Sequence, residues 1–327
     1  MRTLLKSATA RAAVFLAAAT LAASAALAAF TDKPIKIIVP FSPGGGTDLV
    51  SRTIGVGMAQ DLGQPVIIDN KPGAGTIIGT DYVAKSAPDG STLVMATFAH
   101  VVNPSLHAKL PFDWEKSFSP VMLVGRSPNV LVVRADSPYR SVKDIVEAAK
   151  SHPGKLSFAS QGSGTSAHLA GELFKSLSGT DLTHVPYRGA GPALTDLLGG
   201  QVDMMFATAS AAGPLIQSGK VRALGVTTAE RSPSPVLKDV PPIADTVPGY
   251  AADSWYGLLA PAGTPPAVVA RLNAAARKAA QSDLFRSKVA SEGLVVSAGT
   301  PEQLAQYLKG EQARWHKIVR DAHITAD

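Results

Sequence analysis

Residues 34–48 read PIKIIVPFSPGGGTD, and this stretch decides the fold. The apolar run Ile35–Val39 is typical of a buried strand. It ends in a turn with two prolines and the glycines 44–46, after which we expect Thr47 to be the N-cap of a helix extending to about Leu62. Glycines let the backbone approach a ligand closely, and the first N–H groups of a helix have no partner inside it. The stretch therefore predicts an anion-binding turn.

The N-terminus, residues 1–28, is expected to be a secretory signal peptide. Three basic residues precede an apolar segment at 12–25, and Ala26-Leu27-Ala28 fits the A-x-A cleavage rule. A membrane-anchoring helix is the alternative, but the cleavage motif would then be a coincidence. Cleavage after Ala28 also changes the charge argument, because the basic residues of this segment would be lost.

The composition limits the partners that the chain can have. The 327 residues carry a formal net charge of +6; without the three N-terminal cations, 28 basic residues face 25 acidic ones, a charge of +3. This net charge is too small to indicate that the protein binds nucleic acid or a membrane surface. No cysteine is present, so disulfides and a cysteine-linked lipid are excluded. A chain of roughly 300 residues can bury about 75% of its unfolded surface and suggests two domains.

Strand-like and helix-like segments alternate along the chain, which is typical of an α/β fold with parallel sheets flanked by helices. A break at 125–128 joins two strand-like runs without a helix, and it suits a crossing from one domain to a second. The pattern strand, glycine loop, helix occurs at Gly44, Gly73 and Gly162, the first two before the crossing and the third after it. We therefore expect two lobes that present helix N-termini to a shared cleft.

Two other stretches give specific structural predictions. Residues 100–119 are rich in loop signals and predict an irregular connection. Residues 300–303, TPEQ, form a capping box that opens the last helix, with proline at its first position. That helix is expected to bury a stripe of four residues, Leu304, Leu308, Trp315 and Val319.

Several kinds of site are poorly supported. Residues 73–79 resemble G-x-G-x-x-G but contain one residue too many, and no acidic residue ends the next strand. The chain has no P-loop, no G-x-S-x-G elbow and no H-E-x-x-H motif. His168 near Ser163 would need an orienting acid to act as a general base, and none is evident. A histidine that lines the cleft is the simpler interpretation, and an exported enzyme using His168 is the alternative.

Three charged residues allow two interpretations each. Asp48 lies in the first turn of its helix, where a carboxylate complements the helix dipole, but it could equally contact a ligand. Asp203 either starts a strand at the surface, which we favour, or faces the cleft. Arg188 follows a strand and could pair with a carboxylate or lie in solvent.

Taken together, the motifs resemble those of the Bug-type receptors, the extracytoplasmic solute-binding proteins of tripartite tricarboxylate transporters. The resemblance covers the chain beyond the predicted signal peptide and rests on six segments in a fixed order. These are KPIKIIVPFSPGGGTD, DNKPGAGTIIG, SFASQGSGTSAHLAGELF, VPYRGAGPALTDLLGGQVDMMF, VRALGVTTAERSP and YGLLAPAGTPP. The resemblance implies a type II periplasmic-binding-protein fold, a two-lobed "Venus flytrap", with lobe 1 formed by 29–126 and 252–327 and lobe 2 by 127–251.

In this family, one ligand carboxylate is held largely by backbone amides and ordered waters from both lobes. The resemblance places the first-lobe contacts at Phe41, Gly45, Gly46, Thr47, Asp48, Ala74 and Gly75. It places the second-lobe contacts at Ser160, Gly164, Thr165, Ser166, His168, Tyr187 and Thr208. Backbone donors hold any carboxylate, so selection among acids is expected from side chains in 98–104 and 208–214.

The resemblance implies a monomeric periplasmic receptor that captures a di- or tricarboxylate, an acidic amino acid or an aromatic acid. The receptor would deliver this ligand to the membrane subunits of a tripartite tricarboxylate-type transporter. No enzyme activity, metal, cofactor or nucleic acid is expected. A ligand-dependent partner of a membrane sensor is an alternative that the sequence does not separate from a transport receptor.

Overall fold

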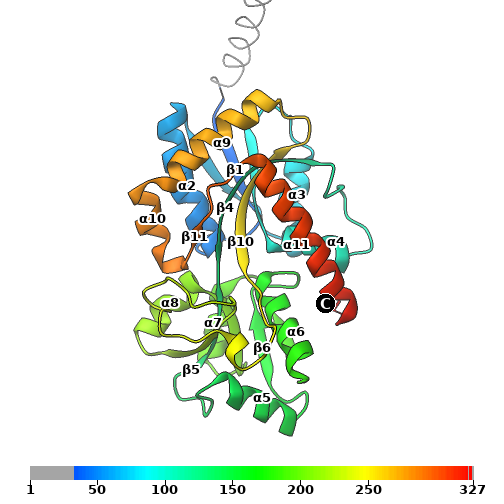
Figure 1. The fold of residues 1–327 in the computed structure, drawn as a ribbon, viewed down its shortest axis with the longest axis vertical. Coiled ribbons are helices and arrows are strands. Elements are labelled where there is room, and N and C mark those ends of the chain that lie inside the picture. The colour runs from blue at the N-terminus through cyan, green and yellow to red at the C-terminus, as the bar shows by residue number, and fades with distance from the viewer. Residues whose placement is uncertain (1–32, 323, 326–327) are drawn as a thin grey trace, which may run out of the picture.

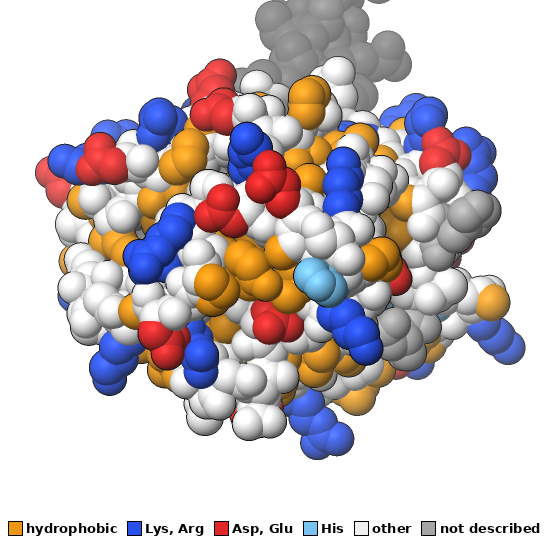
Figure 2. Space-filling model, turned by 90° about the horizontal axis from the view of Figure 1, so that it is seen from below, with side chains coloured by type: hydrophobic (Ala, Val, Ile, Leu, Met, Phe, Trp, Pro, Cys, Tyr) orange, Lys and Arg blue, Asp and Glu red, His pale blue; other side chains and the backbone are white. Residues whose placement is uncertain are grey.

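A computed structural model describes residues 33–322, 324 and 325, so the predicted signal peptide lies outside the described residues. The described chain folds into two sheets, one above the other in Figure 1, each flanked by helices. No helix within this part of the chain has both the length and the apolar character of a membrane span. Figure 2 views the end of the molecule where α5 (Val142–Ser151) lies, and basic and acidic side chains are interspersed on that face.

The first sheet has six strands in the order β11-β4-β10-β3-β1-β2. β1 pairs in parallel with β2 and β3, whereas β10 runs antiparallel to β3 and β4, and β11 antiparallel to β4. The strands are β1 Ile35–Val39, β2 Val66–Asn70, β3 Thr92–Thr97, β4 Phe118–Ser127, β10 Ser254–Pro261 and β11 Val295–Val296.

The second sheet has five strands in the order β7-β6-β8-β5-β9. β6 pairs in parallel with β7 and β8, and β5 runs antiparallel to β8 and β9. The strands are β5 Asn129–Arg134, β6 Ser157–Ser160, β7 Thr183–Pro186, β8 Met204–Thr208 and β9 Val221–Val226.

The predicted α/β class with two sheets is confirmed, but both sheets are mixed, with more antiparallel pairs than we expected. The reason lies in how the chain passes between the sheets. β4 leads out of the first sheet into the second, and β10 leads back into the first, so these neighbouring strands run in opposite directions. In the second sheet, β5 runs antiparallel to both β8 and β9.

Helices cover both faces of each sheet (Figure 1). On the first sheet, β1 directs Ile35, Ile37 and Val39 into a core shared with α2, α9 and α10, and Ile38 into the opposite core. Besides α5, the helices are α2 Gly46–Leu62, α3 Ile77–Ala84, α4 Phe98–Leu106, α6 Ser166–Ser178, α7 Ala190–Leu198, α8 Ala209–Gln217, α9 Pro266–Gln281, α10 Asp283–Val289 and α11 Pro301–Asp321. Single 3-10 turns occur at η1 Ala74–Thr76, η2 Ile243–Asp245 and η3 Ala290–Glu292.

The predicted start of the last helix is confirmed. The Thr300 side chain accepts from the Gln303 N–H, and the Gln303 side chain accepts from the Thr300 N–H, which completes the capping box. All four residues of the predicted stripe are buried: Leu304, Leu308, Trp315 and Val319.

Two local predictions are wrong. Thr47 is not the N-cap of α2, because the helix begins at Gly46 with Gly45 as its N-cap. Asp48 starts the helix earlier, since its carboxylate accepts the Gly44 N–H and so fixes the turn. Thr47 therefore lies in the first helical turn.

The second error concerns 100–119, which begins within α4 instead of forming a loop throughout. Thr97 and His100 make a capping box at the start of this helix, and the His100 ring accepts the Thr97 N–H at 3.0 Å. The first six residues of α4 are buried, so the helix has no polar face there from which its period could be read.

Helix α2 packs against α9 with almost no side chain between the two backbones at Gly57. A Cβ added to Gly57 would lie 2.6 Å from the Cβ of Ala279. A Cβ added to Gly310, in the middle of α11, would meet nothing within 4 Å. Both glycines therefore lie within helices, but only Gly57 lacks room for a side chain.

We expect Gly57→Ala to lower the free energy of unfolding by about 1–3 kcal/mol, because overpacking outweighs the better helix propensity of alanine. The matched control Gly310→Ala should raise it by up to about 1 kcal/mol. Urea unfolding of both variants measures the difference. Equal effects of the two substitutions would contradict the close packing of α2 against α9.

Candidate functional site

The three predicted glycine turns all lie where a strand gives way to a helical segment. The first joins β1 to α2, the second joins β2 to η1, and the third joins β6 to α6. The second and third turns come from different sheets, yet a Cβ added to Gly75 would lie 3.3 Å from the carbonyl oxygen of Ser163. The fold therefore brings these two turns into contact, although about 90 residues of sequence separate them.

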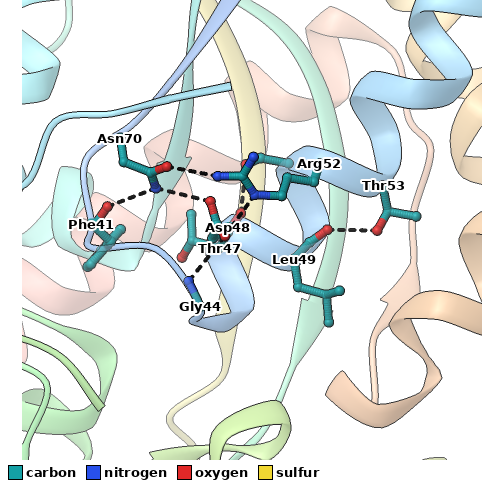
Figure 3. A network of polar contacts seen from close by, with 9 residues as sticks. Phe41, Gly44, Thr47, Asp48, Leu49, Arg52, Thr53 and Asn70 are labelled. Carbon is teal, nitrogen blue, oxygen red and sulfur yellow. Dashed lines mark hydrogen bonds and ion pairs between the residues drawn. The ribbon is translucent and has the colours of Figure 1, made fainter. Parts of the chain in front are cut away.

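The first turn is held by the network in Figure 3. The Asp48 carboxylate accepts from the Gly44 N–H at 3.1 Å, from Asn70 Nδ2 at 3.0 Å and from Arg52 Nε at 2.9 Å. Asn70 Nδ2 also donates to the carbonyl oxygen of Phe41 at 3.0 Å. Burial by itself would raise the pKa of Asp48, but the hydrogen bonds from Arg52, Gly44 and Asn70 bring the pKa below its ordinary value. Both carboxylate oxygens thus have donors within the protein, which supports the structural interpretation of Asp48.

Gly45 and Gly46 differ in what surrounds them. A Cβ at Gly45 would meet nothing within 4 Å, whereas a Cβ at Gly46 would lie 2.3 Å from Oε1 of Glu292. Gly45 is extended, with φ −89° and ψ 175°, and gives α2 its first unpaired N–H groups. Gly45 thus borders open space, and Thr47 beside it is half-buried.

The second turn has an unusual backbone. Ala74, Gly75 and Thr76 all have positive φ, at 47°, 57° and 83°. Positive φ is rare for a β-branched residue such as Thr76, and strain of this kind persists only where the surroundings hold it. Asn103 of α4 provides such support, because its Nδ2 donates to the Gly75 carbonyl oxygen at 2.8 Å and to Thr76 Oγ1 at 3.3 Å.

Asn103 also reaches the third turn. A Cβ added to Gly164 would lie 2.9 Å from Asn103 Oδ1, which is buried and has no hydrogen-bond partner in the described part of the chain. Segment 98–104 is predicted to set specificity, but no sequence signal singles out Asn103. Asn103 contacts the two turns from helix α4, and the sequence analysis does not predict this helix.

Side chains fix the third turn from within. Ser160 Oγ accepts the Gly162 N–H at 3.1 Å and lies 2.7 Å from His184 Nε2. Thr165 is the N-cap of α6, with its Oγ1 donating to the Gly162 carbonyl oxygen at 2.6 Å. These contacts tie the turn to its own side chains and to His184.

His168 is part of the same support. Its ring is 2% exposed, stacks on His184 with 4.1 Å between centroids, and accepts the Gly164 N–H at 3.1 Å. The ring therefore fixes the backbone at Gly164, and it occupies the Gly164 N–H that the resemblance assigns to the ligand. The ring is thus buried and supports the third turn, and the interpretation of His168 as a residue that lines the cleft stays a prediction.

The remaining second-lobe candidates are also engaged. Ser166 Oγ accepts from Asn129 Nδ2 at 3.0 Å, and Thr208 is the N-cap of α8. The Tyr187 hydroxyl donates to Asp196 at 2.7 Å. Burial and the neighbouring Asp196 carboxylate raise the pKa of Tyr187 to about 12. The Tyr187 ring is partly buried and packs against the core of the second sheet, while its hydroxyl is held by Asp196.

Two charged candidates lie away from these turns or in solvent. Asp203 precedes β8 and accepts from the Ser157 N–H at 2.8 Å and Ser157 Oγ at 2.9 Å, so it fixes the beginning of β6, as we favoured. Arg188 is exposed. No three His, Cys, Asp or Glu residues of the described chain form a group suited to a metal ion.

The fold and the facing turns define a two-lobed binding protein of the α/β class. Residues 50–324 match the family model described as the tripartite tricarboxylate transporter family receptor. The chain belongs to this family, and the resemblance inferred from the sequence is confirmed. Because the family consists of receptors, the enzyme alternative is not supported.

Curated relatives agree with this assignment. The chain is 42% identical to the "UPF0065 protein in tcbD-tcbE intergenic region" of Pseudomonas sp. strain P51, over 92% of this chain and 90% of the relative. It is 36% identical to protein BugT of Bordetella pertussis, over 94% of this chain and 95% of the relative.

Solved structures share the fold. Rpa4515 of R. palustris, solved with adipate, is 35% identical with a TM-score of 0.85, covering 90% of this chain and 98% of that one. MatC of Rhodopseudomonas palustris, solved with bound malate, is 36% identical with a TM-score of 0.82, covering 89% of this chain and 100% of that one.

We expect Asp48→Asn to lower the free energy of unfolding by about 1–2 kcal/mol at pH 7, because charge-assisted bonds to Gly44 and Arg52 are lost. The pKa of Asp48 is lowered in the folded state, so its stabilisation is complete above pH 3.8 and disappears as the pH falls through the folded-state pKa. Urea unfolding at pH 7 and pH 3 should show the gap between wild type and variant closing at the lower pH.

The control for this experiment is Asp239→Asn, at an exposed aspartate between β9 and η2. It should leave the free energy of unfolding unchanged within about 0.5 kcal/mol. A gap for Asp48→Asn that stayed the same at pH 3 would show that the charge of Asp48 does not support the turn.

Proposed function

We propose that this protein is a periplasmic receptor that captures a small carboxylate between its lobes for a tripartite tricarboxylate-type transporter. The observation that carries the proposal is the contact between the glycine turns of the two sheets, at Gly75 and Ser163. Family relatives solved with adipate and with malate show that this fold accommodates dicarboxylates. The family's role as transporter receptors supports delivery to membrane subunits of such a transporter, and we propose that the receptor acts as a monomer.

The lobes in this proposal follow the two sheets. The strands of the first sheet come from residues 35–127 and 254–296, and those of the second from 129–226. We accordingly assign 29–126 and 252–327 to lobe 1 and 127–251 to lobe 2. Periplasmic localisation rests on the family and on the signal peptide inferred for residues 1–28.

The ligand carboxylate is proposed to lie against the first turn, near Gly45. Support comes from the open space at Gly45 and from the unpaired N–H groups at the start of α2. Turns two and three, with Ala74, Gly75 and Ser166, complete the site. Hydrogen bonds to a charged group contribute about 1.5–3 kcal/mol each, so a few are enough for micromolar affinity after the cost of association.

A thermal-shift screen tests the function. Adipate, malate, citrate, aspartate and benzoate are each compared with their uncharged amides. A carboxylate at about 100 times its Kd should stabilise the fold by about 2.7 kcal/mol, which raises the melting temperature by several degrees. Stabilisation by the amides but not by any carboxylate would refute the proposal. Mass spectrometry of ligand that co-purifies with the protein extends the screen to acids outside this set.

We expect Gly45→Val to weaken carboxylate binding at least tenfold, because the valine side chain fills the open space at the turn. The extended backbone at Gly45 accepts valine without strain, so the fold should lose only about 1 kcal/mol through the poorer N-cap. Isothermal titration with the acid identified by the screen measures the affinity.

Gly310→Val is the matched control, since a Cβ there also meets nothing within 4 Å. It should bind like the wild type. If Gly45→Val also binds like the wild type, the carboxylate does not lie at the first turn.

A further inference from the structure

Glu292 is a fully buried carboxylate that connects elements of the two sheets. Its Oε1 accepts from the Tyr256 hydroxyl, on β10 of the first sheet, at 3.1 Å. Its Oε2 accepts from the Ser210 N–H, in α8 behind the second sheet's β8, at 3.2 Å. One side chain therefore spans the boundary between the sheets.

Two helix N-termini meet at this carboxylate. Gly46 is the first residue of α2, and Glu292 lies so close to it that even a methyl group would not fit. Ser210 is the second residue of α8, a helix of nine residues. Helix N-termini carry a partial positive charge, so both helices stabilise an anion at this point.

Few titratable groups face Glu292. Among the described residues it makes no ion pair, and the one titratable side chain that bonds it is Tyr256, whose own pKa burial raises. Asp48 of α2 is bonded to Gly44, Arg52 and Asn70. No titratable partner of Glu292 comes from α8, where Ser210 makes the contact. Burial raises the pKa of Glu292, and the bonds from Ser210 and Tyr256 offset this only in part.

We propose that Glu292 is a positioning residue of the ligand cleft: its carboxylate ties the start of α8 to β10 and α2, and so holds the lobes closed around the binding turns. This inference rests on the proposed function, because lobe closure is what a two-lobed receptor needs. Without the bridge, Tyr256 and the Ser210 N–H would lose a buried partner, which disfavours closure.

Closure then depends on pH in a defined direction. Opening exposes Glu292 to water, so the pKa of its carboxyl is higher in the closed form than in the open one. A proton is therefore taken up on closing, and closure becomes more favourable as the pH falls from the closed-form value toward the ordinary 4.5. Each unit of difference in pKa changes the closing equilibrium tenfold.

The absence of cysteine allows a direct test. Spin labels on Ala270→Cys in α9 and Lys150→Cys in α5, both exposed, lie toward opposite ends of the molecule in Figure 1. Pulsed electron paramagnetic resonance then reports the distance between the lobes in ligand-free protein at pH 7.5 and pH 4.5. The same label pair is measured in Glu292→Ala, Glu292→Gln and the exposed control Glu230→Gln.

The wild type should gain closed population when the pH falls from 7.5 to 4.5, the ordinary pKa of the carboxyl, and Glu230→Gln should do the same. Glu292→Gln, which resembles the protonated carboxyl, should stay closed and lose the pH dependence. Glu292→Ala should show a second distance population at both pH values. A pH response that is equal in wild type and Glu292→Gln would overturn the proposal, and this comparison stands even if Glu292→Ala does not fold.

An unaltered distance distribution in folded Glu292→Ala would also overturn it. Because no ligand is present in these measurements, their failure is distinguishable from failure of the carboxylate screen. A receptor that binds a carboxylate but ignores Glu292 would leave the proposed function intact.

Discussion

A single residue, Pro128, separates the end of β4, in the first sheet, from the start of β5, in the second. This extended passage is the constraint on which the rest of the structure depends. The direct crossing passes the chain from one sheet to the other, and in the folded chain the turn after β2 lies against the turn after β6.

The two buried carboxylates near the ligand cleft are stabilised in different ways. Asp48 has a cation, Arg52, and two further donors, and these outweigh the cost of burial. Glu292 has no cation among its described partners and depends on two hydrogen bonds at helix N-termini, so burial prevails. The first arrangement fixes a turn within one lobe. The second joins elements that belong to different sheets, which is why only Glu292 can respond to their relative movement.

The sequence predicted the turns well because glycine and proline act locally. Gly44, Gly73 and Gly162 mark turns with positive φ, and the capping box at Thr300 needs only residues three apart. Helix α4 was missed because its burial removes the polar face that reveals a helical period. Asn103 and Glu292 were missed for another reason: each matters through a partner that lies far away in the sequence, so no local pattern marks it.

The amino-acid sequence by itself determined the class of fold, the family and the positions of the glycine turns, because these depend on spacing, backbone freedom and ordered motifs. Only the tertiary structure decided which turns meet, that Asp48 and His168 support the turns from behind, and that Glu292 connects the sheets. Hydrogen bonds between distant segments form only when the whole chain has packed, and the balance of burial and hydrogen bonds then shifts the pKa of each carboxylate.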